Sequence, residues 1–285
     1  MPDKKPNENI NKSNADIKSA AAIISVKNLT KRFGDSVAVN DISFSVAPGE
    51  IFAFLGPNGA GKSTTIKMLI TLLAPTSGEA LVGGHDIVSG AAQVRRTIGY
   101  VPQMISVDGT LTARENLMLM ARLYEVPRRE QKTRVNDVLE FLNLGAHADA
   151  LVRTFSGGMI RKMEIGQAML HRPSVLFLDE PTTGLDPVAR QNVWQHLLEL
   201  RKNFGITIFF STHYMEEADA VSDRIAIMNQ GRLAIIGTGA ELKNQVGKPE
   251  ATLEDAFIHF TGDQLDQPSN FREVKRNRQN ERRLG

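Results

Sequence analysis

The nine residues GPNGAGKST, at positions 56–64, combine three glycines with a lysine and two hydroxyl side chains. The spacing Gly56-x-x-x-x-Gly61-Lys62-Ser63 matches the P-loop pattern in full. Its glycines let the backbone curl so that successive N–H groups point at phosphate oxygens. Lys62 can place its ammonium on the outer phosphates, and Ser63 can offer a hydroxyl to Mg²⁺. We therefore predict a nucleotide phosphate site formed by Gly56, Pro57, Asn58, Gly59, Ala60, Gly61, Lys62, Ser63 and Thr64.

Two adjacent carboxylates supply the second half of such a site. They are Asp179 and Glu180, at the end of the apolar run VLFLDE. The alternation of a strand sends neighbouring side chains in different directions. One carboxylate can therefore hold the Mg²⁺ shell while the other faces the attacking water.

A second stretch, TFSGGMIRK at positions 154–162, also has the composition of a phosphate loop. A serine and two glycines run into a helical pattern, and the free N–H groups of a helix N-terminus bind phosphate. One chain thus carries two candidate phosphate loops, separated by about ninety residues of sequence, and a single nucleotide needs only one of them.

The elements around the first loop are those that a P-loop requires. Residues 51–55, IFAFL, are continuously apolar, as expected of a strand buried on both faces. After the loop, Ile66, Leu69, Ile70 and Leu73 fall at the i, i+3, i+4, i+7 spacing of an amphipathic helix. Short strands precede this unit, among them DISFSV with its alternating pattern. These patterns predict an α/β fold of the P-loop NTPase class.

The remaining chain divides into a helical insert and a return to core strands. TARE at positions 112–115 is a capping box that opens a helix rich in Met and Leu, and a second helix is expected over about 129–142. Core-type strands return at 174–180 and 206–213, with a helix between them. Asn229-Gln230-Gly231 then indicates a hairpin, followed by a short helix with Leu253, Phe257 and Phe260 in register.

Composition narrows the possible functions. The chain has 285 residues, 41% of them hydrophobic, and a net charge of +2, which gives no reason to expect nucleic acid as a partner. It has no cysteine, so disulfides, thiolate metal sites and cysteine nucleophiles are excluded. We expect neither a signal peptide nor a membrane span. If the protein works at a membrane, a partner must supply the span.

The block RTFSGGMIRKMEIGQAMLHRPSVLFLDEPTTGLDP resembles the signature, Walker B and D-loop segments of ATP-binding cassette (ABC) transporter ATPases. The resemblance implies a RecA-like core with an N-terminal antiparallel β subdomain and an inserted α-helical subdomain at about 106–170. It implies a nucleotide-binding domain over 23–245, after a disordered extension at 1–22 and before a C-terminal helix and basic tail at 246–285. ATP and Mg²⁺ are the implied cofactors.

The resemblance also assigns roles residue by residue. Phe33 matches the aromatic side chain that stacks on adenine, and Gln103 matches the glutamine that reaches the metal and the water. Asp179 matches the Mg²⁺-shell aspartate, Glu180 the general base, and His213 the histidine at the γ-phosphate. In such proteins two ATPases pair head to tail, and Ser156, Gly157 and Gly158 match the loop that binds the partner's ATP, while Asp186 matches an interface aspartate. The second phosphate loop would thus serve a second copy of the chain.

Details of the motifs point to one branch of the family. Phe155 and Met159 replace the usual leucine and glutamine around Ser-Gly-Gly, a form that is similar to ATPases of the daunorubicin-resistance type. This implies an exporter ATPase at the cytoplasmic face of the membrane, bound to a separate transmembrane permease. The helix with Met118, Leu119, Met120 and Leu123 is a candidate docking surface. An importer ATPase is an alternative, as is a non-transport ABC ATPase, although the insert lacks the coiled coil of DNA-repair members.

Overall fold

The computed structural model describes residues 22–262. Its elements in chain order are β1 (Ile24–Phe33), β2 (Ser36–Val46), β3 (Ile51–Leu55), α1 (Lys62–Leu69), β4 (Ser77–Val82), β5 (His85–Asp86), α2 (Ala91–Thr97), β6 (Ile98–Val101), α3 (Ala113–Leu123), α4 (Arg128–Phe141), α5 (Gly157–Met169), β7 (Val175–Asp179), α6 (Pro187–Phe204), β8 (Thr207–Thr212), α7 (Met215–Val221), β9 (Arg224–Asn229), β10 (Arg232–Gly237), α8 (Gly239–Asn244) and α9 (Leu253–Thr261). The predicted N-terminal extension, except for residue 22, and the basic tail from 263 lie outside these residues.

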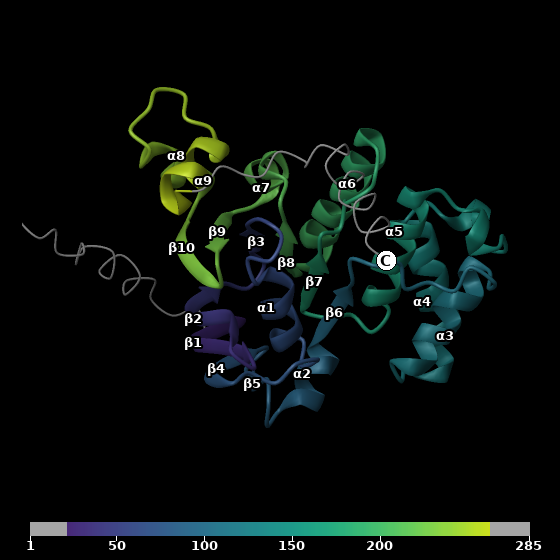
Figure 1. The fold of residues 1–285 in the computed structure, drawn as a ribbon. Helices are drawn as coiled ribbons and strands as arrows, with labels where there is room; N and C mark the ends of the chain where they lie inside the picture. The colour runs from purple at the N-terminus through teal and green to yellow at the C-terminus, as the bar shows by residue number, and fades with distance from the viewer. Residues whose placement is uncertain (1–21, 263–285) are drawn as a thin grey trace, which may run out of the picture.

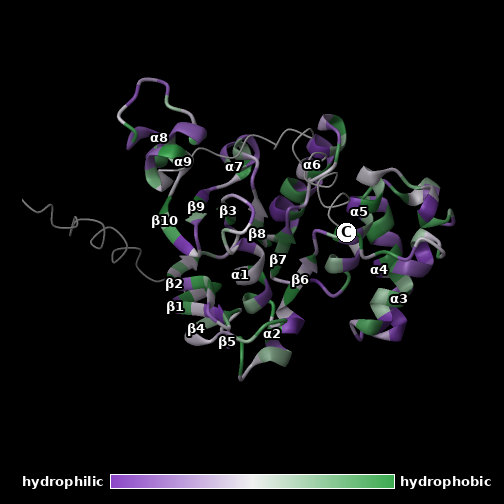
Figure 2. Cartoon of the chain, viewed as in Figure 1, coloured by the Kyte–Doolittle hydropathy of each residue, from purple (hydrophilic) through white to green (hydrophobic). Residues whose placement is uncertain are grey.

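A six-stranded sheet in the order β10-β9-β3-β8-β7-β6 forms the centre of the molecule (Figure 1). Its strands pair in parallel, apart from the antiparallel pair β9–β10. All five residues of β3 are buried, as its continuous apolar run predicts. Phe52 and Phe54 contribute to the core on one face of the sheet, whereas Ile51, Ala53 and Leu55 contribute to the core on the other. Figure 2 shows β7, which pairs with β8 in the same sheet, in the hydrophobic colour.

A second sheet, in the order β2-β1-β4-β5, is antiparallel and packs against the first. The alternation in DISFSV buries Ile42, Phe44 and Val46 as expected. The rings of Phe44 and Phe52 stack across the two sheets with their centroids 5.6 Å apart, and both rings lie close to Phe209 of β8. This aromatic cluster joins the antiparallel sheet to the strand that leads into the P-loop.

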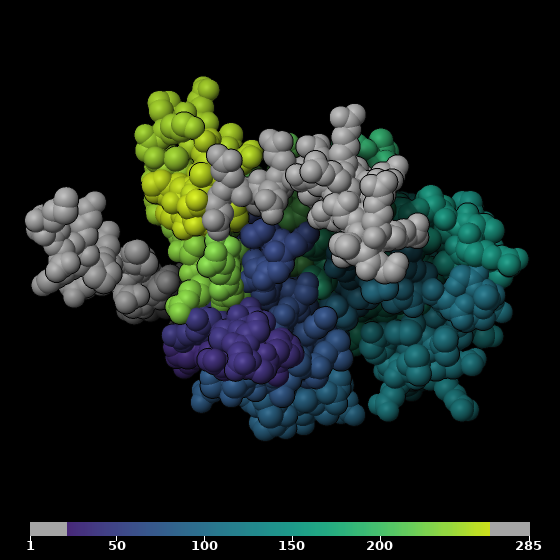
Figure 3. Space-filling model, in the orientation of Figure 1, coloured from purple at the N-terminus to yellow at the C-terminus, as the bar shows by residue number. Residues whose placement is uncertain are grey.

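The helices α3, α4 and the first part of α5 form the lobe at the right of Figures 1 and 3. This lobe has a core of its own, which includes Leu117, Leu139 and Met163. The predicted capping box is present: the Thr112 side chain accepts a hydrogen bond from the backbone N–H of Glu115, whose carboxylate accepts one from the N–H of Thr112. The fold therefore has the α/β architecture with an antiparallel β subdomain and an inserted helical subdomain that the resemblance implies.

The helix after the P-loop is shorter than its apolar spacing suggests. It ends at Leu69, and Thr71 adopts a left-handed φ of 66°, so that Ile70 and Leu73 lie beyond the last helical residue. Both residues still pack against the core of the antiparallel sheet. The elements β4, β6 and α2 were not predicted, because they are short and carry glycine or exposed polar residues.

The predicted hairpin joins β9 to β10, with Gln230 and Gly231 at positive φ values of 48° and 77°. Two positive φ values at the turn are the geometry that Gly favours in two-residue hairpins. The predicted C-terminal helix is α9, in which Leu253 and Phe257 are buried. Over residues 22–262, no helix combines the length and the hydropathy that crossing a bilayer requires.

Candidate nucleotide-binding site

The P-loop connects β3 to α1, and two of its glycines are required by close contacts. A Cβ atom at Gly56 would lie 2.2 Å from the backbone oxygen of Met228 in β9. At Gly61, where φ is 105°, it would lie 2.5 Å from the backbone oxygen of Ala38. Only glycine allows the loop to curl this tightly between the two sheets.

Lys62 begins α1 and lies inside the loop, with 4% of its surface exposed. Its Nζ donates hydrogen bonds to the backbone oxygens of Gly56 at 2.8 Å and Pro57 at 3.1 Å. It also lies 3.5 Å from Oε1 of Glu180. Burial lowers the pKa of Lys62, while the nearby Glu180 carboxylate opposes this shift. The loop and the carboxylate together place a positive charge where phosphate would bind.

Asp179 ends β7 and accepts two hydrogen bonds at Oδ1. Ser63 Oγ donates one at 2.9 Å, and Ser211 Oγ of β8 donates the other at 2.6 Å. A carboxylate and a hydroxyl are hard oxygen donors of the type that Mg²⁺ prefers, and Mg²⁺ sites in phosphate-binding enzymes usually use one or two such groups together with phosphate and water. The side chains of Ser63 and Asp179 therefore fit a magnesium ion.

Glu180 follows the strand with a left-handed φ of 49°, so the turn after β7 sets its direction more than strand alternation does. Its backbone N–H donates to Ser211 Oγ at 3.0 Å. Three side chains approach its Oε2, namely Gln103 Nε2 at 3.2 Å, Thr183 Oγ1 at 3.2 Å and His213 Nδ1 at 3.3 Å. The close contact with His213 and the charge of Lys62 lower the pKa of the Glu180 carboxyl, against the effect of burial. This carboxylate is therefore ionised at neutral pH.

These side chains surround one pocket of about 250 Å³. Among the described residues, it is lined by Asn58, Gly59, Ala60, Gly61, Lys62, Ser63, Thr64, Gln103 and Glu180. Asp179 adjoins it through its hydrogen bond with Ser63, and His213 adjoins it through its 3.3 Å contact with Glu180. The P-loop, the two carboxylates, Gln103 and His213 thus meet at the carboxyl ends of β3, β7 and β8, although they lie far apart in sequence.

Phe33 lies at the end of β1 and does not line this pocket. Its side chain is 51% exposed, which excludes the simpler interpretation of a core residue at a strand end. Lys31 Nζ lies 5.1 Å from the centre of its ring. An exposed aromatic face of this kind is available for stacking.

The Ser-Gly-Gly loop lies at the start of α5, also outside the lining of the P-loop pocket. Ser156 caps the helix by accepting a hydrogen bond from the N–H of Met159. A Cβ atom at Gly158 would lie 3.0 Å from Cβ of Ala189, in the first turn of α6. Asp186 caps that turn by accepting a hydrogen bond from Ala189 N at 2.9 Å. Ser156, Gly157 and Asp186 are exposed, so this loop and Asp186 form a second surface, separate from the chain's own P-loop pocket.

Sequence reasoning missed two residues of the pocket environment. Ser211 bonds both Asp179 and the N–H of Glu180, and Thr183 bonds the Glu180 carboxylate. A signal for Ser211 was present, because a serine interrupts the apolar run IFF just before His213.

Comparisons with known proteins identify the family of this chain. The family described as ABC transporter matches residues 39–183. A linearmycin resistance ATP-binding protein of Bacillus subtilis (strain 168) is 42% identical over 79% of this chain and 72% of its own. A daunorubicin/doxorubicin resistance ATP-binding protein of Streptomyces peucetius is 42% identical over 79% of this chain and 68% of its own. A solved structure of the ATP binding subunit of an ABC transporter is 32% identical with a TM-score of 0.75, and covers 84% of this chain and 99% of that one. The chain therefore belongs to the ABC transporter family and is one of its ATP-hydrolysing ATPases.

Proposed function

We propose that the pocket at the ends of β3, β7 and β8 hydrolyses ATP with Glu180 as the general base. Lys62 and the N–H groups of the P-loop hold the outer phosphates, and Ser63 and Asp179 hold Mg²⁺. The metal, when bound, neutralises phosphate charge. The convergence of Lys62, Gln103 and Glu180 on this pocket supports the proposal most directly.

In this arrangement Glu180 takes the proton from the attacking water. A carboxylate that is ionised at neutral pH is ready to accept a proton. Gln103 and His213 both approach Oε2 of Glu180 and orient this carboxylate. In this role His213 also contacts the γ-phosphate. Phe33 stacks on the adenine ring.

We further propose that two chains pair head to tail around two ATP molecules. Ser156, Gly157 and Gly158 then bind the ATP that sits in the partner's P-loop, and Asp186 bridges the interface. The exposed position of Ser-Gly-Gly, away from the chain's own P-loop pocket, supports this role. ATP closes the dimer and hydrolysis reopens it.

The closing dimer powers export through a separate transmembrane permease at the cytoplasmic face of the membrane. Support for export comes from the names of the two relatives, which are ATP-binding proteins of resistance to linearmycin and to daunorubicin or doxorubicin. The substrate class is accordingly a drug, a lipid or another amphipathic molecule. The nucleotide-binding domain, residues 23–245, would not need nucleic acid as a partner.

Drug accumulation in cells tests the direction of transport. Cells with the intact protein should accumulate less of an amphipathic drug such as daunorubicin than cells with Glu180→Gln, and the difference should disappear when the energy supply is removed. Higher accumulation with the intact protein would instead identify an importer, and equal accumulation across a panel of amphipathic compounds would refute drug export.

The docking surface on α3 is narrower than its composition suggests. Met118 and Met120 are partly buried against the core of the helical lobe, whereas Leu119 and Leu123 are 44% and 65% exposed. Leu119 and Leu123 are spaced i, i+4 and share one face of the helix. We propose that this face contacts the permease.

Crosslinking tests this contact. The chain lacks cysteine, so Leu123→Cys allows selective crosslinking to a co-purifying membrane protein. Crosslinks from Leu198→Cys, an exposed leucine on α6, serve as the control, and equal crosslinking from both positions would argue against this face.

A further inference from the structure

A buried ion pair on α5 lies outside the P-loop pocket. Arg161 is 6% exposed and Glu164 is 2% exposed, and Nη1 of the arginine lies 2.9 Å from Oε2 of the glutamate. Burying two charges costs desolvation energy, which only good geometry and further hydrogen bonds offset. Two apolar residues of similar size would fill the same space without that cost.

Both partners hold the loop of residues 102–106, which follows β6. Arg161 Nη1 donates to the backbone oxygen of Pro102 at 2.7 Å, and Nη2 donates to that of Gln103 at 3.3 Å. Glu164 Oε1 accepts from the backbone N–H of Ser106 at 2.6 Å and from its hydroxyl at 2.9 Å. The arginine thus holds the start of the loop and the glutamate holds its end.

The side chain carried by this loop reaches the hydrolysis site. Gln103 extends from the held segment to Glu180, with Nε2 3.2 Å from Oε2. Met104 and Ile105, between the two attachment points, are 81% and 65% exposed and give the loop almost no packing of their own. The four hydrogen bonds with the ion pair therefore fix the backbone position from which the Gln103 side chain extends.

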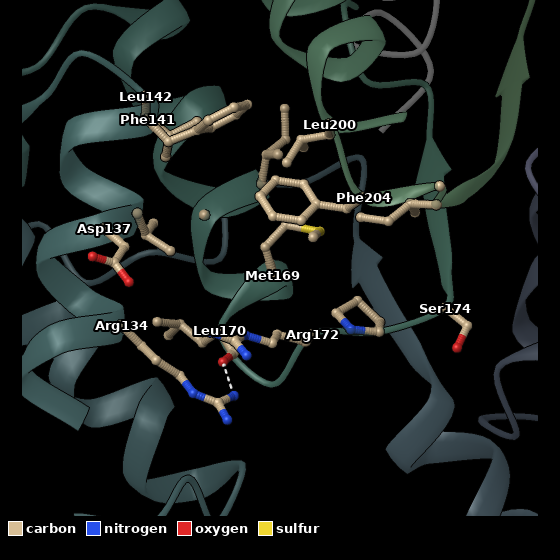
Figure 4. A pocket seen from close by; sticks show the side chains of 16 residues that line it. Arg134, Asp137, Phe141, Leu142, Met169, Leu170, Arg172, Ser174, Leu200 and Phe204 are labelled. Atoms are coloured by element: carbon tan, nitrogen blue, oxygen red, sulfur yellow. Dashed lines mark hydrogen bonds between the residues drawn. The ribbon is translucent and has the colours of Figure 1, made fainter. Parts of the chain in front are cut away.

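The ion pair also lies close to the Ser-Gly-Gly loop. α5 begins at Gly157, so Arg161 and Glu164 occupy its second and third turns, and a helix moves these turns together with its N-terminus. Farther along, α5 borders an apolar cleft of about 450 Å³ between α4 and α6 (Figure 4). Met169 lines this cleft from α5, and Phe141 and Phe204 line it from α4 and α6.

We infer that Arg161 and Glu164 form a clamp that couples the position of α5, with its Ser-Gly-Gly loop, to the position of Gln103 beside Glu180. Both are positioning residues, because they act on the hydrolysis site through Gln103. The inference rests on the proposed roles of Gln103 and Glu180. A shift of α5 on contact with the partner's nucleotide would then move Gln103 in the same step.

The test replaces the clamp by apolar residues in the double variant Arg161→Met/Glu164→Met. This change removes the loop contacts and leaves no buried charge unpaired. Misplacing a group near the reacting atoms by about 1 Å costs roughly 10²-fold in rate. We therefore expect kcat for ATP hydrolysis to fall by roughly that factor, while KM for ATP changes little because the P-loop is untouched. Glu164→Gln serves as a second variant if the double variant does not fold, with a smaller fall in kcat expected.

Two comparisons separate positioning from a general loss of structure. The pair Arg224–Glu50, at 2.8 Å, is a second partly buried ion pair with no contact to loop 102–106, and Arg224→Met/Glu50→Met should leave kcat near that of the wild type. Gln103→Ala should lower kcat in the wild-type background and have no further effect in the clamp variant. An unchanged kcat in the clamp variants, or effects that multiply with Gln103→Ala, would overturn the inference. If Glu180→Gln retained activity, the proposed function would fail instead.

Discussion

Replacing Glu180 by glutamine removes one charge and very little shape. The carboxylate is 6% exposed and lies among Lys62, Gln103, Thr183 and His213. A glutamine at this position keeps one oxygen that can accept from Gln103 or Thr183. It cannot take a proton from water at neutral pH. The substitution therefore tests the base and leaves the pocket nearly intact.

The expected effects differ in size for catalysis and for stability. Loss of a general base lowers the rate by roughly 10²–10⁴-fold, or about 3–5 kcal/mol of barrier. The charge pair with Lys62, at 3.5 Å, contributes an attraction of about 5 kcal/mol at an effective dielectric constant of about 20. Desolvation of both buried groups opposes this attraction, so the net loss of folding free energy is much smaller. The variant should fold, bind ATP and fail to turn it over.

The assay measures phosphate release at saturating ATP, ATP binding by equilibrium titration, and size with ATP present. We expect the variant to bind ATP and to accumulate as a closed dimer. Glu217→Gln is the matched control, because Glu217 is equally buried, bonds Thr182 and Thr212, and does not contact Lys62. Turnover within about threefold of the wild type for Glu180→Gln would refute the assignment of the base. So would an equal loss of turnover in Glu217→Gln.

Three further predictions concern the loops and the pH dependence. Gly56→Ala places a Cβ atom 2.2 Å from a backbone oxygen of β9; the resulting strain of about 1–3 kcal/mol should weaken ATP binding in a titration, and unchanged affinity would contradict the tight loop geometry. A second experiment mixes chains that carry Lys62→Ala with chains that carry Gly158→Asp. In the mixed dimer one site joins an intact P-loop to an intact Ser-Gly-Gly loop, so the two variants should associate when ATP is present. If they associate no more than either variant alone, the Ser-Gly-Gly loop does not act on the partner's ATP. The close contact with His213 keeps the pKa of Glu180 below its ordinary 4.5, so this base stays ionised as pH falls and the acid limb of kcat/KM should lie below that value. His213→Ala should move the limb to higher pH, and an unmoved limb would show that the contact with His213 does not hold the pKa down.

The central strands and the helical lobe were predictable from local sequence. Continuous apolar runs identify β3 and β7, because a strand that is buried on both faces carries apolar residues on both of them. The capping box at Thr112 and the hairpin at Gly231 are likewise local, since each depends on side chains only a few residues apart. The strands β4 and β6 were missed because their burial comes from neighbours brought to them by the fold.

Residue types at fixed spacing are enough to identify the phosphate loop and the acidic strand end. How these two motifs meet depends instead on contacts between distant segments of the chain. The left-handed turn at Glu180 directs its carboxylate to Lys62, although strand alternation was the expected cause. Arg161 and Glu164, spaced i, i+3, have the sequence pattern of an ordinary exposed helix pair. They are buried because the loop after β6 folds over them. The two segments are about sixty residues apart, and neither local sequence by itself predicts their contact.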